Sequence, residues 1–125
     1  MIKPRRIQRM RSRGWRMPEN TISVTRPGRW GNPYRVGAEP INGDGGQTLE
    51  ESLWAYEHLF LLGRDLTELR GKNLACWCPI CDSNGKYVPC HADILLSLAN
   101  NIPIDEVENE NFRIEEVHVQ NSLIT

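Results

Sequence analysis

All four cysteines of this 125-residue chain lie in one stretch, residues 74–96. The stretch opens within a short apolar run, residues 72–77, which is typical of a buried strand. It closes with helical periodicity that runs from residue 91 to residue 100. The sequence therefore predicts a strand, a loop and a helix that meet at one corner. The thiol and imidazole side chains of this corner are Cys76, Cys78, Cys81, Cys90 and His91.

The remaining segments favour an alternation of strands and helices. Apolar and polar residues alternate over residues 21–25, as they do in a strand. Thr48 and Glu51 have the spacing of a capping box, and the helix that they open ends at Gly63. This order predicts an α/β protein, specifically a small single-domain Rossmann-like three-layer fold with a short, mostly parallel sheet. In such sheets, binding sites form where strands end and helices begin.

Charge is distributed unevenly, although the formal net charge is only −1. Residues 1–35 contain ten of the fifteen basic residues, whereas residues 101–125 contain six acidic residues and one basic residue. Such asymmetry indicates a basic surface that binds an anion, or an acidic tail that covers it. We expect three parts: a basic N-terminal arm that is partly docked (1–20), an α/β core domain with the Cys/His corner (21–100), and an acidic C-terminal tail that could add a late strand (101–125).

No run of residues is apolar enough to span a membrane, and the N-terminus is rich in arginine instead of carrying the apolar core of a signal peptide. We therefore expect a cytoplasmic protein without a membrane partner, in which thiols stay reduced. Clustered cysteines in that compartment indicate metal binding or catalysis before structural disulfides. The sequence does not indicate an oligomeric state.

Zinc is the metal that such a cluster favours, because zinc sites take four thiolate or imidazole ligands. Cys78 and Cys81 have the spacing of a zinc knuckle. Cys90 and His91 would complete a first ligand set, although adjacent side chains often diverge. Cys76 shares a strand face with Cys78 and could take a place in a second set. Both sets stay open, as does the alternative that the cysteines are small buried apolar residues.

The same corner also fits a catalytic site, because a thiol beside an imidazole at a helix N-terminus has a lowered pKa. Cys90 or Cys78 could be the nucleophile and His91 its base. Asp93 could orient a neighbouring catalytic group or act as a proton donor. The structural alternative is that an acid in the first turn of a helix interacts favourably with the helix dipole. One catalytic class is excluded, since zinc nucleobase deaminases carry His-x-Glu ahead of Pro-Cys-x-x-Cys, and this chain has no His-x-Glu.

A second candidate site is the loop at residues 26–34, which contains two prolines and two glycines. Arg26 and Arg29 could contact phosphate, while Trp30 could stack on a base and Asn32 could add a polar contact. The structural alternative is that Trp30 fills the core and the arginines pair with the acidic tail. The chain lacks both common glycine-rich phosphate-binding motifs.

Five segments carry a family resemblance: residues 4–8, 13–18, 26–34, 69–79 and 89–96. By these segments the chain resembles the DUF4326 family, an uncharacterised set of small bacterial and phage proteins. The resemblance covers residues 4 to about 99 and implies no established activity. It implies a site that rests on Cys76, Cys78, Cys90 and His91, with Cys81 in a local insertion. The strand followed by Cys-His is also similar to the DUF488 family, which supports a Rossmann-like sheet.

Two functions fit these observations. The first is a small protein that binds or modifies a nucleotide or nucleic acid, with a zinc-loaded Cys/His centre next to the arginine and tryptophan loop. The alternative is a non-enzymatic interaction module, such as a phage protein that binds a host factor, in which the Cys/His centre is purely structural. Whether the chain is an enzyme stays open. The first function requires the Cys/His corner and the loop around Trp30 to lie on the same side of the molecule.

Overall fold

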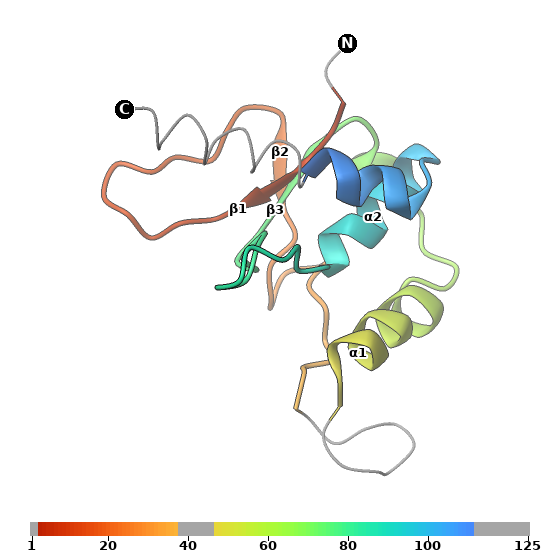
Figure 1. The fold of residues 1–125 in the computed structure, drawn as a ribbon. Coiled ribbons are helices and arrows are strands. Elements are labelled where there is room, and N and C mark those ends of the chain that lie inside the picture. The colour runs from red at the N-terminus through yellow and green to blue at the C-terminus, as the bar shows by residue number, and fades with distance from the viewer. Residues whose placement is uncertain (1–2, 38–46, 112–125) are drawn as a thin grey trace.

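The computed structural model describes residues 3–37 and 47–111, which form a small α/β fold (Figure 1). Its sheet has three parallel strands in the order β1-β3-β2. These strands are β1 (Arg6–Gln8), β2 (Thr21–Ser23) and β3 (Asn73–Cys76). Leu74 of β3 pairs with Arg6 on one side and with Ile22 on the other. The predicted α/β class with a short parallel sheet is confirmed, and the arrangement is consistent with a Rossmann-like fold.

Strand β1 lies in the segment that we assigned to the basic arm. The backbone N–H of Arg9 extends its pairing with β3 by donating to the carbonyl of Cys76 at 2.7 Å. Arg6 and Ile7 are both buried. A three-residue strand that contains an arginine and a glutamine shows no usable alternation, so the sequence did not indicate it. The first part of the arm is therefore an edge strand of the sheet.

Helix α1 (Leu49–Ala55) begins where the sequence predicts it. The hydroxyl of Thr48 accepts from the N–H of Glu51, and the carboxylate of Glu51 accepts from the N–H of Thr48, each at 3.1 Å. The chain continues through a π-helical turn, η1 (Tyr56–Phe60), and a short 3-10 turn, η2 (Thr67–Leu69), leads into β3. Tyr56 is fully buried, so η1 sets an aromatic ring against the core.

Helix α2 (His91–Asn100) supplies much of the core, in which its Leu95 packs with Leu74 of β3. Residues 104–111 are also helical. The late strand that the sequence suggested over residues 112–119 lies outside the described residues. Within the described part of the chain, every helix is too short or too polar to cross a membrane.

Three loops leave the sheet at the carboxyl ends of its strands. Arg9 follows β1, Val24 follows β2 and Trp77 follows β3. Because the strands are parallel, these residues lie at one edge of the sheet, where ligands commonly bind in open α/β folds. Helix α2 starts at the same edge, since Cys90 at its N-terminus contacts Cys76 at the end of β3.

Candidate metal centre

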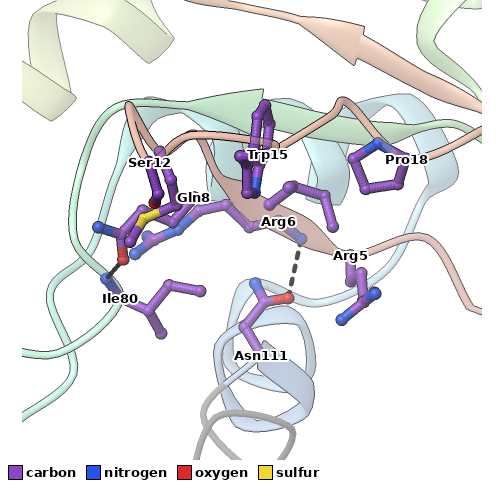
Figure 2. A pocket seen from close by; sticks show the side chains of 10 residues that line it. Arg5, Arg6, Gln8, Ser12, Trp15, Pro18, Ile80 and Asn111 are labelled. Carbon is purple, nitrogen blue, oxygen red and sulfur yellow. Dashed lines mark hydrogen bonds between the residues drawn. The ribbon is translucent and has the colours of Figure 1, made fainter.

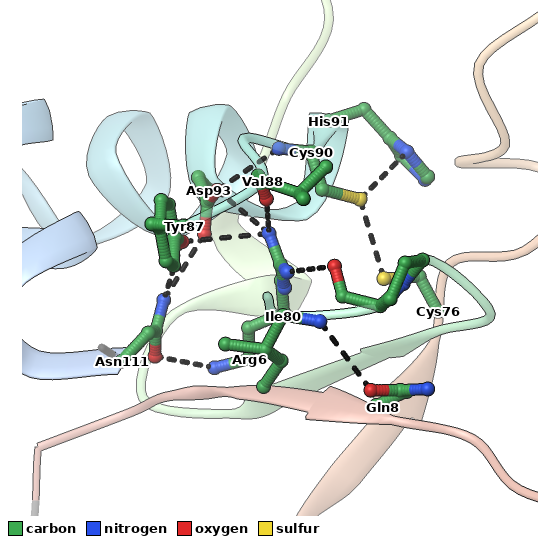
Figure 3. A network of polar contacts seen from close by, with 11 residues as sticks. Arg6, Gln8, Cys76, Ile80, Tyr87, Val88, Cys90, His91, Asp93 and Asn111 are labelled. Atoms are coloured by element: carbon green, nitrogen blue, oxygen red, sulfur yellow. Dashed lines mark hydrogen bonds and ion pairs between the residues drawn. The ribbon is translucent and has the colours of Figure 1, made fainter. Parts of the chain in front are cut away.

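Three thiols converge at the carboxyl edge of the sheet. Cys76 is the last residue of β3, Cys78 follows in the loop, and Cys90 caps the N-terminus of α2. Their sulfur atoms all lie within 4.8 Å of one another. Figure 3 shows two of them, the sulfurs of Cys76 and Cys90, which are 3.2 Å apart. Cys76 and Cys90 are buried, whereas Cys78 is half-buried. Three cysteines in this arrangement could hold a metal ion.

His91 directs one ring nitrogen at the thiols and the other at the backbone. Its Nδ1 lies 3.4 Å from the sulfur of Cys90, and its Nε2 lies 2.6 Å from the carbonyl oxygen of Val24. A carbonyl oxygen can only accept, so Nε2 carries a hydrogen, and in the neutral imidazole Nδ1 then presents its lone pair toward Cys90. A histidine that binds a metal usually makes such a bond with its second nitrogen. The adjacent Cys90 and His91 side chains therefore converge, although the sequence favoured their divergence.

The three thiols differ in how readily they lose a proton. Hydrogen bonds from Cys76 and then from Cys90 lower the pKa of Cys78 well below its ordinary value. The bonds that Cys76 makes to Cys78 and to Cys90, together with its burial, raise the pKa of Cys76. The cluster thus holds a negative charge most readily on Cys78, and thiolates are the form in which cysteines bind metals.

Cys81 does not belong to this group of thiols. It is half-buried and forms an isolated antiparallel bridge with Tyr87 inside the loop between β3 and α2. Among the described residues, the group of potential ligands contains Cys76 and not Cys81. The structure thus brings together Cys76, Cys78 and Cys90, whereas His91 contacts Cys90 at 3.4 Å but is not part of the group whose potential ligand atoms all lie within 4.8 Å of one another.

Arg6 holds the first strand against this corner, and sequence reasoning missed it. Its guanidinium is completely buried. Its Nη1 donates to the Asp93 carboxylate at 2.9 Å and to the Val88 carbonyl at 2.8 Å, and its Nη2 donates to the Pro79 carbonyl at 2.9 Å (Figure 3). Burial alone would lower the pKa of Arg6, but the charge of Asp93 and the groups around it raise that pKa, so the side chain stays cationic. One arginine therefore fixes both ends of the loop that carries the cysteines.

Asp93, which the sequence suggested as a catalytic residue, is the partner in this ion pair. Its carboxylate also accepts from the backbone N–H of Cys90 and from the amide of Asn111, each at 3.0 Å. Burial raises the pKa of Asp93, and the charge of Arg6 opposes that rise. The carboxylate caps α2 and positions Cys90, which is the structural role open to an acid in the first helical turn.

Trp30 and Asn32 form the interior of the second candidate site. The indole of Trp30 is buried and donates to the carboxylate of Glu68 at 2.7 Å. The amide of Asn32 is also buried, where it donates to the hydroxyl of Ser52 at 3.0 Å and accepts from the N–H of Tyr34 at 2.8 Å. The structure thus places both side chains inside the scaffold of the loop, as in the structural alternative for Trp30.

The arginines of the same loop line a pocket of about 520 Å³. None of the described residues that line it is acidic. Arg29 also lies 3.4 Å from the carboxylate of Glu68, outside that lining. A side chain at Gly31 would place its Cβ 2.8 Å from the backbone of Arg26, so only glycine fits there. The lining residues of this pocket, the arginine pocket, are Arg26, Pro27, Gly28, Arg29, Gly31, Pro33, Arg35, Phe60 and Arg64.

Tyr56 connects the arginine pocket to the cysteines. Its hydroxyl donates to the carbonyl of Trp30 at 2.5 Å. Its ring meets the ring of His91 edge-on at 5.2 Å and stacks on Phe60 at the same centroid distance. The loop near Trp30 and the Cys/His corner therefore lie on the same side of the molecule, as the first function requires.

A second pocket of about 570 Å³ lies along β1 and the loop that follows it (Figure 2). At its edge, the amide oxygen of Asn111 accepts from the backbone N–H of Arg6 at 3.0 Å. Among the described residues, its lining contains no cysteine and no residue of the arginine pocket. The residues that line it are Arg5, Arg6, Ile7, Gln8, Met10, Ser12, Trp15, Pro18, Ile80 and Asn111.

Comparison with known proteins confirms the resemblance seen in the sequence. A family model described as a domain of unknown function (DUF4326) matches residues 7–101. This range includes the three clustered cysteines, His91 and the whole arginine pocket, whereas Arg6 lies one residue outside it. Neither the curated proteins nor the solved structures include a match.

Proposed function

The chain belongs to the DUF4326 family, whose description states no activity, and from the chemistry of its own residues we propose that it is a zinc-stabilised nucleotide-binding protein. A zinc ion held by Cys76, Cys78, Cys90 and His91 would fix the carboxyl edge of the sheet. The arginine pocket beside it would bind the phosphate groups of the nucleotide. The observation that carries this proposal is a pocket lined by four arginines that is joined through Tyr56 to the Cys/His corner.

The spacing of the donor atoms supports zinc. With Zn–S near 2.3 Å and Zn–N near 2.0 Å, a tetrahedral site separates two sulfurs by about 3.8 Å, and a sulfur from a nitrogen by about 3.5 Å. The Cys90 sulfur and the His91 Nδ1 are 3.4 Å apart, and the Cys76 and Cys90 sulfurs are 3.2 Å apart. All three sulfurs lie within 4.8 Å of one another. His91 contacts Cys90 but lies outside the group of three thiols, so a tetrahedron of three thiolates and one imidazole requires the His91 ring to move closer to Cys76 and Cys78 when zinc binds.

Four protein ligands make a closed site, and closed zinc sites are structural, because a catalytic zinc keeps an open position for water or substrate. In this proposal Cys90 and His91 serve as ligands and not as nucleophile and base. The metal then joins the end of β3 to the start of α2. It acts on the nucleotide only by holding the neighbouring loop in place.

The composition of the arginine pocket supports a phosphate-bearing ligand. Guanidinium groups bind phosphate oxygens in pairs of parallel hydrogen bonds, and each such bond is stronger than one between neutral groups. The Nε of Arg26 donates to the carbonyl of Asn32, which holds that side chain in the loop. Arg64 lies over the ring of Phe60 at 3.9 Å, so flat aromatic and cationic surfaces adjoin within the pocket. Such a surface suits a base as well as a phosphate.

A binding screen on protein of measured zinc content tests the proposal. Isothermal titration calorimetry would compare nucleoside mono-, di- and triphosphates with the matching nucleosides and with inorganic phosphate. We expect saturable binding of phosphate-bearing nucleotides, weakened at least about tenfold in the Arg26→Gln/Arg29→Gln variant, because hydrogen bonds to charged groups contribute about 1.5–3 kcal/mol. The control is Lys86→Gln, which removes a positive charge outside the pocket. Zinc-loaded protein that binds no nucleotide, or a double variant that binds as tightly as the Lys86→Gln control, would refute nucleotide binding at this pocket.

A further inference from the structure

The exposed tryptophan at the carboxyl edge of the sheet, Trp77, has no part in the metal centre or the arginine pocket. It is 40% exposed, although a large apolar ring gains free energy from burial. The guanidinium of Arg9 lies 4.5 Å from the centre of a Trp77 ring, and that of Arg11 lies 4.8 Å from it. We propose that this surface, defined by Trp77, Arg9 and Arg11, binds single-stranded nucleic acid.

The backbone and side chain of Arg9 are held in place at this surface. Its N–H donates to the carbonyl of Cys76, directly before Trp77. Its Nη1 lies 3.2 Å from the hydroxyl of Ser23 at the end of β2 and 3.4 Å from the hydroxyl of Thr25 in the loop after β2, so the side chain reaches past β3. A guanidinium that contacts both residues 23–25 and the Trp77 ring loses little conformational entropy when a ligand binds. Arg9 therefore forms a prepared cationic plane beside the indole.

The charge around this surface fits the phosphate backbone of a nucleic acid. Residues 3–18 contain seven basic residues and no acidic one. Arg11, Arg13 and Arg16 are exposed. Within residues 3–37 and 47–111, neither these three arginines nor Arg9 forms an ion pair. Cations that no neighbouring carboxylate neutralises displace counterions from phosphates and so supply most of the affinity for nucleic acid.

The flat groups at this surface indicate a single strand and not a duplex. Unpaired bases stack on exposed aromatic rings and on guanidinium planes, whereas the bases of a duplex are already stacked on one another. Met10 and Ser12, on either side of Arg11, line the pocket of Figure 2 together with Trp15, so further aromatic surface lies along the same loop. A strand laid over Arg11 would thus find stacking partners and phosphate contacts side by side. This inference does not depend on nucleotide binding at the arginine pocket.

Fluorescence anisotropy with short labelled oligonucleotides tests this surface on the full chain. Single-stranded DNA, single-stranded RNA and a duplex of the same sequence form three arms, each titrated at several salt concentrations. We expect salt-dependent binding of one or both single strands that exceeds binding of the duplex. Trp77→Ala should weaken it about fivefold to about a hundredfold, the contribution of stacking one base. The matched control is Trp54→Ala, since Trp54 is 57% exposed on α1 and should leave binding unchanged.

Arg11→Gln is the second variant, because it removes an exposed charge without touching the core. It should weaken binding and lower the dependence of affinity on salt by about one phosphate contact. The proposal is overturned if neither single strand binds, or if the duplex binds equally well and Trp77→Ala has no more effect than Trp54→Ala. Calorimetry with mononucleotides on the same variants separates this outcome from failure of the arginine pocket.

Discussion

The Nε2 atom of His91 lies 2.6 Å from the carbonyl oxygen of Val24, and this contact joins the first residue of α2 to the residue that follows β2. Because the carbonyl accepts the hydrogen on Nε2, Nδ1 faces Cys90 with its lone pair when the imidazole is neutral. A metal bound to the cysteines and His91 would therefore be tied to the segment that leads into the arginine loop. The metal would then help to hold the loop of the arginine pocket in place.

Loss of the imidazole should weaken metal binding strongly. Loss of a residue that only hydrogen-bonds a metal ligand reduces metal affinity by roughly ten- to hundredfold. Because His91 is itself a proposed ligand, we expect His91→Gln to reduce zinc affinity by more than that. Competition with a chromophoric chelator measures this directly. His58→Gln is the matched control, because His58 is half-exposed on η1 and lies apart from the cysteines. Equal zinc affinities in the two variants would remove His91 from the ligand set.

The buried ion pair between Arg6 and Asp93 should be one of the most sensitive points of the fold. Arg6→Met leaves the Asp93 carboxylate buried without its charge partner, which costs about 3–5 kcal/mol in the free energy of unfolding. Urea denaturation measures the loss. Lys3→Met is the control, because its pair with Glu106 is half-exposed and such pairs contribute about 0–1 kcal/mol.

The same pair offers an internal check on its cause. In Arg6→Met/Asp93→Leu no charge remains buried, so we expect the double variant to regain part of the stability lost in Arg6→Met. The contrary result is additivity, in which the double variant loses the sum of the stabilities lost in Arg6→Met and in Asp93→Leu. The loss would then come from packing and not from an unpaired charge.

Gly31 should tolerate no side chain. In Gly31→Ala the new Cβ would lie 2.8 Å from backbone atoms of both Arg26 and Thr25, so the loop must shift. We expect a loss of about 1–3 kcal/mol in stability and weaker nucleotide binding, measured by denaturation and calorimetry. Gly28→Ala provides a graded comparison, because its Cβ would meet a single backbone oxygen at 2.9 Å. A larger effect at Gly28 than at Gly31 would contradict this account of the loop.

Sequence patterns predicted the elements that carry strong local signals. The capping box at Thr48, the apolar run before Cys76 and the helical periodicity after His91 placed α1, β3 and α2. Strand β1 was missed because it has three residues and owes its position to pairing with β3, which lies far away in the sequence. Local pattern cannot show such pairing.

The sequence predicted that the site consists of cysteines and a histidine, but not which of the cysteines lie together. The spacing of Cys78 and Cys81 suggested a knuckle, whereas the loop between β3 and α2 folds so that Cys76 joins the group instead. That loop is held by Arg6, whose burial depends on an ion pair with Asp93 across 87 residues of sequence. The burial of Trp30 likewise depends on Glu68, so its solvent exposure could not be inferred from its own loop.

Metal content per chain, measured by elemental analysis and native mass spectrometry, tests the central claim most directly. The wild-type chain, Cys78→Ser and Cys81→Ser should be purified in parallel, since both cysteines are half-buried and lie in the same loop. We predict a single zinc ion in the wild-type chain and in Cys81→Ser, and loss of zinc in Cys78→Ser. A wild-type chain that carries no zinc after exposure to it, or a Cys81→Ser variant that loses the metal as Cys78→Ser does, would contradict the proposed centre.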